Sequence, residues 1–376
     1  MPGGGLLTLC MILKDEAHTI ASTLASAKPF VDRWVVLDTG STDGTQEIVR
    51  RELQGVPGEL HEEPFVDFAT TRNRSLDLCG DATEFILWLD ADDELRDGAA
   101  LRKYLQGERG SRAADREVYN VRIDMGFVFD SSRILRARAG WRFKGVVHEV
   151  LVHPDRPPPV HRVPGASIRH EGTTQGVERT RKRWERDVGL LSGALEQSPA
   201  DTRTAFYLAC TLCWLRRDEE AIVAFQRRIA LGGWHEEVFQ SKLEIARCAE
   251  RLGRPWPEVL SAFLDAYAQS PHRAEPLHDI ALHHNKLGEH ALCVLYARRA
   301  YDLPHPKSDT LFVEADVYAW KAADLLGTSA YWIGELELGE EAARKALRAR
   351  PDDERLQKNL GFYLERKTAK KKARQA

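Results

Sequence analysis

Two aspartates separated by one alanine, Asp90 and Asp92, directly follow the apolar run at residues 85–89. A run of this length predicts a buried strand, and the strand aims both carboxylates at whatever lies beyond its end. Hard cations such as Mn²⁺ and Mg²⁺ prefer carboxylate oxygens and keep open positions for phosphate groups. The pattern predicts a Mn²⁺ or Mg²⁺ site that neutralises a diphosphate. An Asp-x-Asp sequence is common in solvated loops, so the neighbouring segments must decide.

Two earlier apolar runs, residues 6–13 and 34–37, also have the length of strands, and polar segments 14–16 and 38–45 follow them. Short apolar runs that alternate with helix-like stretches predict a mostly parallel sheet with crossover helices. In such open sheets the ligand binds beyond the carboxyl ends of the strands. We therefore expect all three polar segments to meet at one edge of the sheet.

The segment after the second run contains the residues of a tight turn and a helix start. Gly40 and Gly44 permit close backbone approach, and Thr42 or Asp43 can cap the next helix. Asp38 is then placed to accept hydrogen bonds from a ribose or a base.

Arg72 and Asn73 come early in a predicted helix that precedes the strand at residues 85–89. A guanidinium there can contact a base or phosphate groups.

The order of these segments resembles the pattern of glycosyltransferase family 2: residues 11–16, then 38–45, then Arg72 with Asn73, then residues 90–92. The resemblance is close over about the first hundred residues. It implies an α/β GT-A fold, that is, a nucleotide-diphospho-sugar transferase with a Rossmann-like mixed sheet, and an inverting, metal-dependent transferase. One departure is Asp15, where family members often carry Asn.

The resemblance also implies roles for single residues. Glu16 and Asp38 are expected near the nucleoside and Arg72 near the nucleotide, Asp90 toward ribose or metal, and Asp92 on the metal. We add Asp43 and Asn73 to the nucleotide-sugar site.

Residues 143–150 resemble a Gly-x-x-His-Glu segment found in the bacterial tetratricopeptide-containing branch of the same family. An inverting transfer needs a base against the acceptor nucleophile, and we favour Glu149, with His148 or Asp124 as alternatives. The zincin spacing fails because three residues separate Glu149 from His153. The valines around this segment favour a strand instead.

His170 resembles the late histidine that completes the metal shell in many GT-A enzymes, so it joins Asp90 and Asp92 as a candidate ligand. A surface histidine without a ligand is the alternative interpretation. His170 ends a predicted short strand at residues 166–170, after the proline-rich loop at residues 154–164.

From about residue 176 the apolar residues follow a helical period. Pro199, Pro271 and Pro351 each stand nine and ten residues before an apolar and small pair, as in tetratricopeptide helix pairs that stack into a solenoid. We predict domains at residues 1–176 (GT-A) and 177–366 (an all-α tetratricopeptide-like helical repeat domain), then a basic disordered tail at residues 367–376. Five tryptophans of the second half are expected to pack between helices: Trp214, Trp234, Trp256, Trp320 and Trp332.

Composition excludes several classes of protein. The net charge is −3, with 43% hydrophobic and 30% charged residues, so nothing indicates a nucleic-acid partner or a disordered chain. Six scattered cysteines indicate a reducing, cytoplasmic setting without disulfides, and no segment is typical of a signal peptide or a transmembrane helix.

These features predict an enzyme that moves a hexose from a UDP-sugar to an acceptor. A peptide or protein side chain is the favoured acceptor, because the domain arrangement is similar to that of sublancin-type peptide S-glycosyltransferases. A saccharide or lipopolysaccharide-core acceptor stays open, and so does a non-catalytic repeat scaffold. The helical repeats also offer a face for a possible homodimer.

Overall fold

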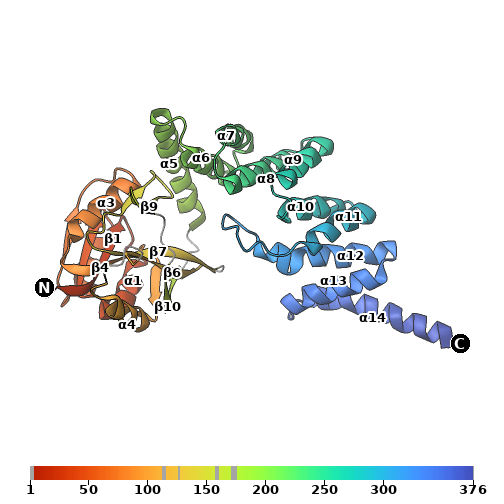
Figure 1. The fold of residues 1–376 in the computed structure, drawn as a ribbon, viewed down its shortest axis with the longest axis horizontal. Helices are drawn as coiled ribbons and strands as arrows, with labels where there is room; N and C mark the ends of the chain where they lie inside the picture. The colour runs from red at the N-terminus through yellow and green to blue at the C-terminus, as the bar shows by residue number, and fades with distance from the viewer. Residues whose placement is uncertain (1–3, 112–115, 126–127, 157–160, 171–175, 376) are drawn as a thin grey trace. The chain divides into compact units, whose positions relative to one another are not determined.

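The chain folds into two compact units, residues 1–194 and 195–376, one α/β and one helical (Figure 1). The computed structural model describes residues 4–111, 116–125, 128–156, 161–170 and 176–375. Helix α5 (Gly176–Gln197) begins where the helical period was predicted to start and ends beyond the division between the units.

Eight strands of the described residues form one mixed sheet in the first unit, in the order β3-β2-β1-β4-β7-β6-β10-β5. β1, β2, β3 and β4 run parallel, whereas β7 is antiparallel to both β4 and β6. A separate ribbon pairs β8 (Arg142–Lys144) with β9 (Val150–Val152). The strands of the main sheet are β1 (Gly5–Leu13), β2 (Arg33–Asp38), β3 (Gly58–Glu62), β4 (Thr83–Trp88), β5 (Asp93–Arg96), β6 (Val118–Asp124), β7 (Val128–Arg136) and β10 (His161–His170).

The strands predicted from the apolar runs are confirmed as β1, β2 and β4. In the parallel register Leu13 lies beside Asp38, and Cys10 lies beside Trp88. The carboxyl ends of these three strands therefore share one edge, which places the three polar segments together.

Helices cover both faces of the sheet. Leu7 and Leu9 of β1 pack with α1 (Ile20–Ala27), α2 (Thr45–Glu52) and α4 (Gly98–Glu108). Cys10 and Val35 point the other way, toward α3 (Phe68–Cys79) and Phe143. Because successive residues of a strand face opposite sides, this burial of both faces explains why the strands read as continuous apolar runs.

The strand predicted around residues 146–152 is only partly correct, because β9 covers just its last three residues. Gly145 and His148 have φ angles of 112° and 51°, so the backbone turns before the strand begins. A left-handed turn at these positions overrides the strand preference of the neighbouring valines. Strand β10 includes the predicted residues 166–170 and starts earlier, whereas residues 157–160 of the proline-rich loop lie outside the described part of the chain.

The second unit consists of successive helix pairs. Neighbouring helices pack as pairs: α6 with α7, α8 with α9, α10 with α11, and α12 with α13. The first helices of some successive pairs are also in contact: α6 with α8, α10 with α12, and α12 with α14. This is the arrangement of a tetratricopeptide-like solenoid, in which each pair covers the face of the next. The helices are α6 (Thr202–Trp214), α7 (Asp218–Ala230), α8 (His235–Arg251), α9 (Trp256–Gln269), α10 (Glu275–Lys286), α11 (His290–Asp302), α12 (Ala322–Ile333), α13 (Leu336–Ala349) and α14 (Glu354–Gln375).

The proline-based repeat pattern marks real helix starts, since Pro199, Pro271 and Pro351 stand just before α6, α10 and α14. Proline cannot continue a helix, so it commonly stands in the loop between the end of one helix and the start of the next. The pattern missed η2, a π-helix at Val317–Lys321 that precedes α12.

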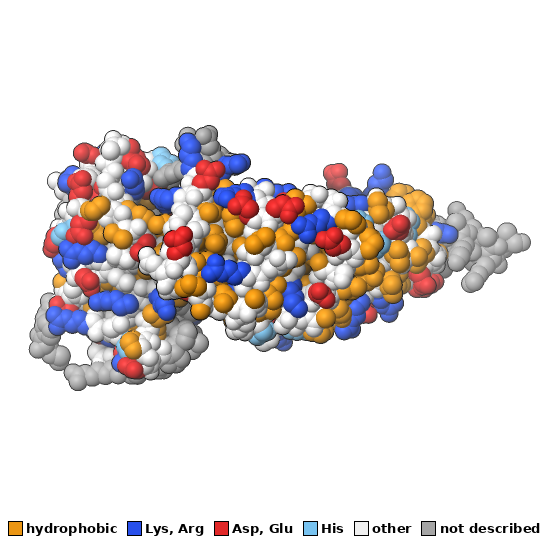
Figure 2. All heavy atoms as spheres, turned by 90° about the horizontal axis from the view of Figure 1, so that it is seen from above, with side chains coloured by type: hydrophobic (Ala, Val, Ile, Leu, Met, Phe, Trp, Pro, Cys, Tyr) orange, Lys and Arg blue, Asp and Glu red, His pale blue; other side chains and the backbone are white. Residues whose placement is uncertain are grey.

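Two expectations for the second half differ from the structure. Residues 367–375 continue α14 rather than forming a disordered tail, because Lys, Ala, Arg and Gln all favour helix and no Gly or Pro interrupts them. Trp332 and Trp234 are 67% and 41% exposed, so they do not pack fully between helices. Figure 2 shows that hydrophobic side chains gather at the surface of the helical unit toward its C-terminal end.

All six cysteines are free and buried, in agreement with a chain that carries no disulfide framework. Within the described residues, no helix combines the length and the apolar composition that crossing a bilayer requires.

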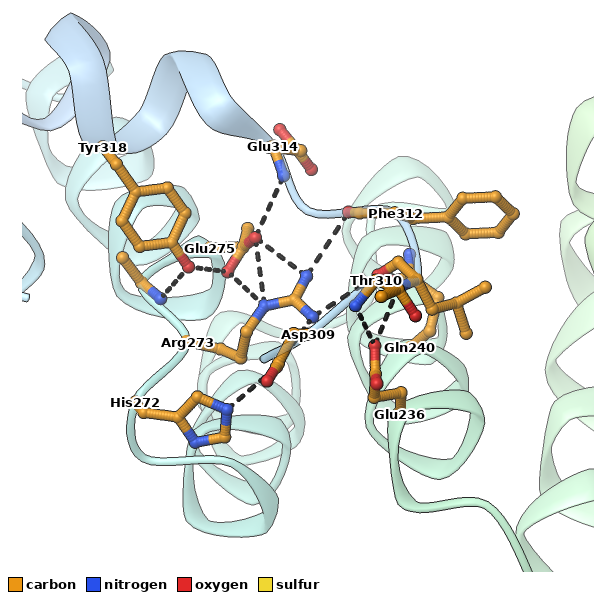
Figure 3. A network of polar contacts seen from close by, with 12 residues as sticks. Glu236, Gln240, His272, Arg273, Glu275, Asp309, Thr310, Phe312, Glu314 and Tyr318 are labelled. Atoms are coloured by element: carbon orange, nitrogen blue, oxygen red, sulfur yellow. Dashed lines mark hydrogen bonds and ion pairs between the residues drawn. The ribbon is translucent and has the colours of Figure 1, made fainter. Parts of the chain in front are cut away.

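The segment 309–314 between α11 and η2 lies against α8 and the start of α10, held by a buried network (Figure 3). Arg273 and Glu275 are fully buried and form an ion pair with a distance of 2.9 Å. Arg273 also donates to the carbonyl oxygens of Leu311 and Phe312, while Glu275 accepts from Tyr318 Oη at 2.8 Å. The segment therefore depends on two buried charges that satisfy each other.

We predict that Arg273→Met lowers the free energy of unfolding of the full chain by about 3 kcal/mol, because the Glu275 charge stays buried without its partner. Urea unfolding followed by far-UV circular dichroism measures this change. The control Arg217→Met breaks an exposed pair with Glu220 and should stay within about 0.5 kcal/mol of the wild type. Equal effects of the two substitutions would contradict the role given to the buried pair.

Candidate functional site

Asp38 ends β2 at the shared edge of the sheet and is completely buried. Its Oδ1 accepts hydrogen bonds from the amides of Gly40 at 2.9 Å and Ser41 at 2.8 Å, and from Gln46 Nε2 at 3.1 Å. Its Oδ2 is buried and has no hydrogen-bond partner. A buried carboxylate oxygen without a donor is costly, so this atom is able to accept a hydrogen bond from a ligand or a water molecule.

The loops after β1 and β2 are bonded to each other. Asp43 Oδ2 accepts from the amide of Ala17 at 3.0 Å, and its Oδ1 accepts from the hydroxyl and the amide of Thr45. The amide of Glu16 in turn donates to the Thr45 hydroxyl at 2.8 Å. The N-cap of α2 is Gly44, without a side-chain cap, so the predicted capping by Thr42 or Asp43 is not seen. The Asp43 carboxylate instead bonds to the amide of Ala17 and to Thr45, within the loops.

Arg72 of α3 connects two carboxylates of the site. Its Nη2 donates to Asp90 Oδ1 at 2.7 Å and its Nε donates to Glu149 Oε1. The guanidinium lies over the ring of Trp88, with Cζ 4.4 Å from the ring centre. Burial acts to lower the pKa of Arg72, but the charges of Asp90 and Glu149 raise it above its usual value. Arg72 is therefore a permanent cation at the centre of the site.

Arg133 of β7 binds the other oxygen of Asp90, with its Nη1 3.2 Å from Oδ2. The same nitrogen lies 3.0 Å from Asp93 Oδ2, and Cζ lies 4.0 Å from the centre of the Trp88 ring. Burial acts to raise the pKa of Asp90, but the two guanidinium groups hold it well below the usual range. Asp90 is thus an anion whose two oxygens are both held by arginines.

Asp92, Asp93 and His170 form a second cluster, brought together by the antiparallel pairing of β10 with β5, in which His170 lies opposite Asp93. His170 Nδ1 lies 3.1 Å from Asp93 Oδ1, and His170 Nε2 lies 3.4 Å from Asp92 Oδ2. The hydrogen bond with Asp93 raises the pKa of His170, and burial raises the pKa of Asp92. The cluster is therefore partly removed from water and held together by the hydrogen bond between His170 and Asp93.

The two clusters share a charge imbalance. Four carboxylates, those of Asp90, Asp92, Asp93 and Glu149, face only two guanidinium groups and one histidine. Two charges remain uncompensated when His170 is neutral, which matches one divalent cation.

The remaining predicted residues lie as follows. Asn73 donates to and accepts from the backbone of Phe143 at 2.9 and 2.8 Å, so both groups of its amide hold β8 in place. His148 is exposed in the turn before Glu149. Asp124 is the last residue of β6. It pairs with Arg169 of β10, and Arg169 directly precedes His170.

Two residues of this site were not predicted from the sequence, Arg133 and Asp93. Arg133 stands inside a strand with no motif around it, so no signal marks it. Asp93 directly follows the predicted pair, and its burial could have been inferred only from the pairing of β5 with β10.

Buried side-chain atoms without partners gather at this edge. Three such atoms in the described residues are Asp38 Oδ2, Trp88 Nε1 and Arg133 Nε. Buried polar groups are normally paired. Three unpaired atoms on β2, β4 and β7 of one sheet are therefore a feature that a ligand site would explain.

Comparison with known proteins agrees with this geometry. Residues 8–107 match the family model described as glycosyl transferase family 2. A TPR repeat-containing protein of Synechococcus elongatus is 32% identical over 235 residues, which cover 60% of this chain and 56% of that protein. The SPbeta prophage-derived glycosyltransferase SunS of Bacillus subtilis is 24% identical over 233 residues, which cover 59% of this chain and 53% of SunS. This chain therefore spans only about half the length of these relatives.

Among solved structures, the crystal structure of MamA aligns with 50% of this chain and 99% of its own, with a TM-score of 0.35 and 15% identity. The matched family model ends inside α4 and thus includes β1, β2 and β4, whose carboxyl ends carry Asp38 and Asp90. The first unit of this chain contains a glycosyltransferase family 2 domain of GT-A type, and a tetratricopeptide-like helical domain follows it.

Proposed function

We propose that the chain is a metal-dependent, inverting glycosyltransferase that moves a hexose from a UDP-sugar to a peptide or protein side chain. One observation carries the proposal: a buried, unpartnered carboxylate oxygen on Asp38 lies at the same sheet edge as the cluster of Asp92 and His170. The Asp38 oxygen can accept a hydrogen bond from a nucleoside, and the cluster of Asp92 and His170 can hold a cation at the diphosphate. Both lie beyond the carboxyl ends of strands of one sheet, which is where open α/β sheets bind their ligands.

The residues present fit a Mn²⁺ or Mg²⁺ ion. Asp92 Oδ2 and His170 Nε2 are the two ligand atoms we propose, and Asp93 would fix the ring by accepting from Nδ1. Asp90 is better suited to orient Arg72 and Arg133, because both its oxygens are already bonded. When bound, the cation supplies positive charge to the diphosphate leaving group.

The nucleotide contacts we propose are Asp38 and Glu16, with Arg72 reaching toward the phosphates. Asp43 and Asn73 are bonded within the protein, so we assign them to holding the loops and β8. Asp90 acts on the nucleotide through the two arginines it holds in place.

Glu149 is the base we propose for the acceptor. Arg72 holds its Oε1, which fixes the carboxylate beside Asp90 and leaves Oε2 as the atom to take the proton. His148 and Asp124 are the alternatives, and the exposed turn of His148 holds it less firmly.

The helical unit supports a peptide or protein as acceptor, since stacked helix pairs expose extended surfaces that suit a chain. A saccharide acceptor is the alternative for the same chemistry. A non-catalytic scaffold is disfavoured, because Asp38, Asp92 and Arg72 of the family pattern are all present at the sheet edge. Six buried free cysteines support a reducing, cytoplasmic setting.

We predict that Asp38→Asn weakens UDP binding by roughly 10- to 100-fold, because the amide keeps an acceptor for Gly40 and Ser41 but turns the unpartnered oxygen into a donor. Isothermal titration calorimetry with UDP measures the change. Asp81→Asn, at an exposed surface pair, is the control and should bind like the wild type. Unchanged binding by the Asp38 variant would remove this residue from the nucleotide site.

We predict that UDP release from a UDP-hexose requires Mn²⁺ or Mg²⁺ and falls by at least about 100-fold in Asp92→Asn. Chelation with EDTA should give the same loss in the wild type, and adding Mn²⁺ should reverse it there but not in the variant. A wild type that binds and cleaves none of a panel of UDP-sugars with either metal would overturn the enzymatic proposal.

We predict that Glu149→Gln lowers kcat for transfer by roughly 10²- to 10⁴-fold while UDP affinity changes less than about threefold. Single-turnover transfer assays and calorimetry measure the two quantities. Glu63→Gln, which alters an exposed pair with Arg74, is the matched control. If His148→Gln costs more activity than Glu149→Gln, the base is the histidine instead.

A further inference from the structure

Two cysteines of the helical unit, outside the glycosyltransferase site, lie side by side on different helices. Cys213 stands near the end of α6 and Cys248 in the last turns of α8, and their Sγ atoms are 3.8 Å apart. Cys248 is fully buried and Cys213 is 8% exposed. Helices α6 and α8 pack against each other, so the two sulfur atoms face each other across a helix contact.

A guanidinium group stabilises negative charge at this pair. Arg251 Nη2 lies 3.2 Å from Cys213 Sγ and 3.0 Å from Cys248 Sγ. The same nitrogen donates to Asp218 Oδ1 at 2.6 Å, which fixes the guanidinium in place. These contacts place one cation between Asp218 and the two sulfur atoms.

The two thiols are not equivalent. The hydrogen bond from Cys248 lowers the pKa of Cys213, with Arg251 acting in the same direction, while burial and the carboxylate of Glu244 oppose it. The hydrogen bond to Cys213 raises the pKa of Cys248. A thiol with a lowered pKa beside a second thiol is the arrangement that favours thiol exchange and oxidation, because the thiolate is the nucleophile.

We propose that Cys213 and Cys248 form a reversible redox couple that hydroperoxides oxidise to a disulfide between α6 and α8. The Cys213 thiolate attacks one oxygen of the hydroperoxide, the O–O bond breaks, and a sulfenic acid forms with release of hydroxide or alkoxide. The Cys248 thiol then attacks the sulfenic sulfur, and water leaves with the hydroxyl group and the thiol proton. A thiol reductant reverses the reaction by exchange.

None of the residues of this couple lies in the first unit, so the proposed redox chemistry uses none of the residues assigned to sugar transfer. Its product ties the first helix of one pair to the first helix of the next, and in a solenoid stability depends on contacts between neighbouring pairs. Oxidation therefore changes a contact between neighbouring helix pairs of the helical unit.

The test uses the folded full chain, treated with hydrogen peroxide, alkylated and digested for mass spectrometry. We expect a linked Cys213–Cys248 peptide pair lacking two hydrogen atoms, which dithiothreitol separates again. Cys210→Ser removes a thiol of the same helix whose pKa is raised by burial, and it should leave the link unchanged. No link under conditions that oxidise other thiols, or a link that uses Cys210, would overturn the proposal.

Two further variants separate chemistry from folding. Cys248→Ser should stop at a Cys213 sulfenic acid that dimedone traps, and Arg251→Met should slow link formation roughly tenfold, with Arg251→Lys restoring part of the rate. Circular dichroism before oxidation confirms that each variant is folded. A rate that is the same in folded Arg251→Met and in the wild type would exclude the proposed activation by the guanidinium.

Discussion

The site depends on one buried cation, Arg72. A guanidinium removed from water is stable only when carboxylates and hydrogen bonds replace its hydration, and Asp90 and Glu149 do this from two different segments. Helix α3, the end of β4 and the turn before β9 are thereby fixed relative to one another. Both carboxylates therefore help to fix Arg72, and the position of Glu149 follows from the fold as much as from any motif.

Trp88 extends this constraint to β7. Its ring lies beside both Arg72 and Arg133, so two cations share one aromatic surface and one carboxylate, that of Asp90. Cation–ring contacts strengthen where water is excluded, which favours arginine over lysine at these positions. The cluster is rigid, and a rigid first layer is what a site needs to hold a charged ligand without rearrangement.

The sequence predicts the strands that carry the site because their apolar runs are continuous, and it predicts the loops because glycine and aspartate have specific uses in turns. Asp38 and Asp92 were named as candidates in this way, whereas His170 was named only from the family resemblance, and their roles stay predictions. The actual partners of Asp90 were not predicted, because Arg133 comes from an antiparallel strand inserted into the sheet, and strand order leaves no mark on the local pattern. The same holds for the inward bonds of Asn73 and for the segment 309–314, whose contacts join residues distant in the chain.

The difference between Asp90 and Asp92 illustrates how tertiary contacts decide between chemically identical residues. Both are aspartates two positions apart, yet arginines lower the pKa of one while burial raises that of the other. A carboxylate already neutralised by two guanidiniums gains little from a metal ion, whereas one surrounded by further carboxylates gains much. The two aspartates of the motif therefore have different surroundings. Asp90 is bonded to Arg72 and Arg133, whereas Asp92 lies beside His170, whose other ring nitrogen lies 3.1 Å from Asp93, and this is why we propose Asp92 rather than Asp90 as the metal ligand.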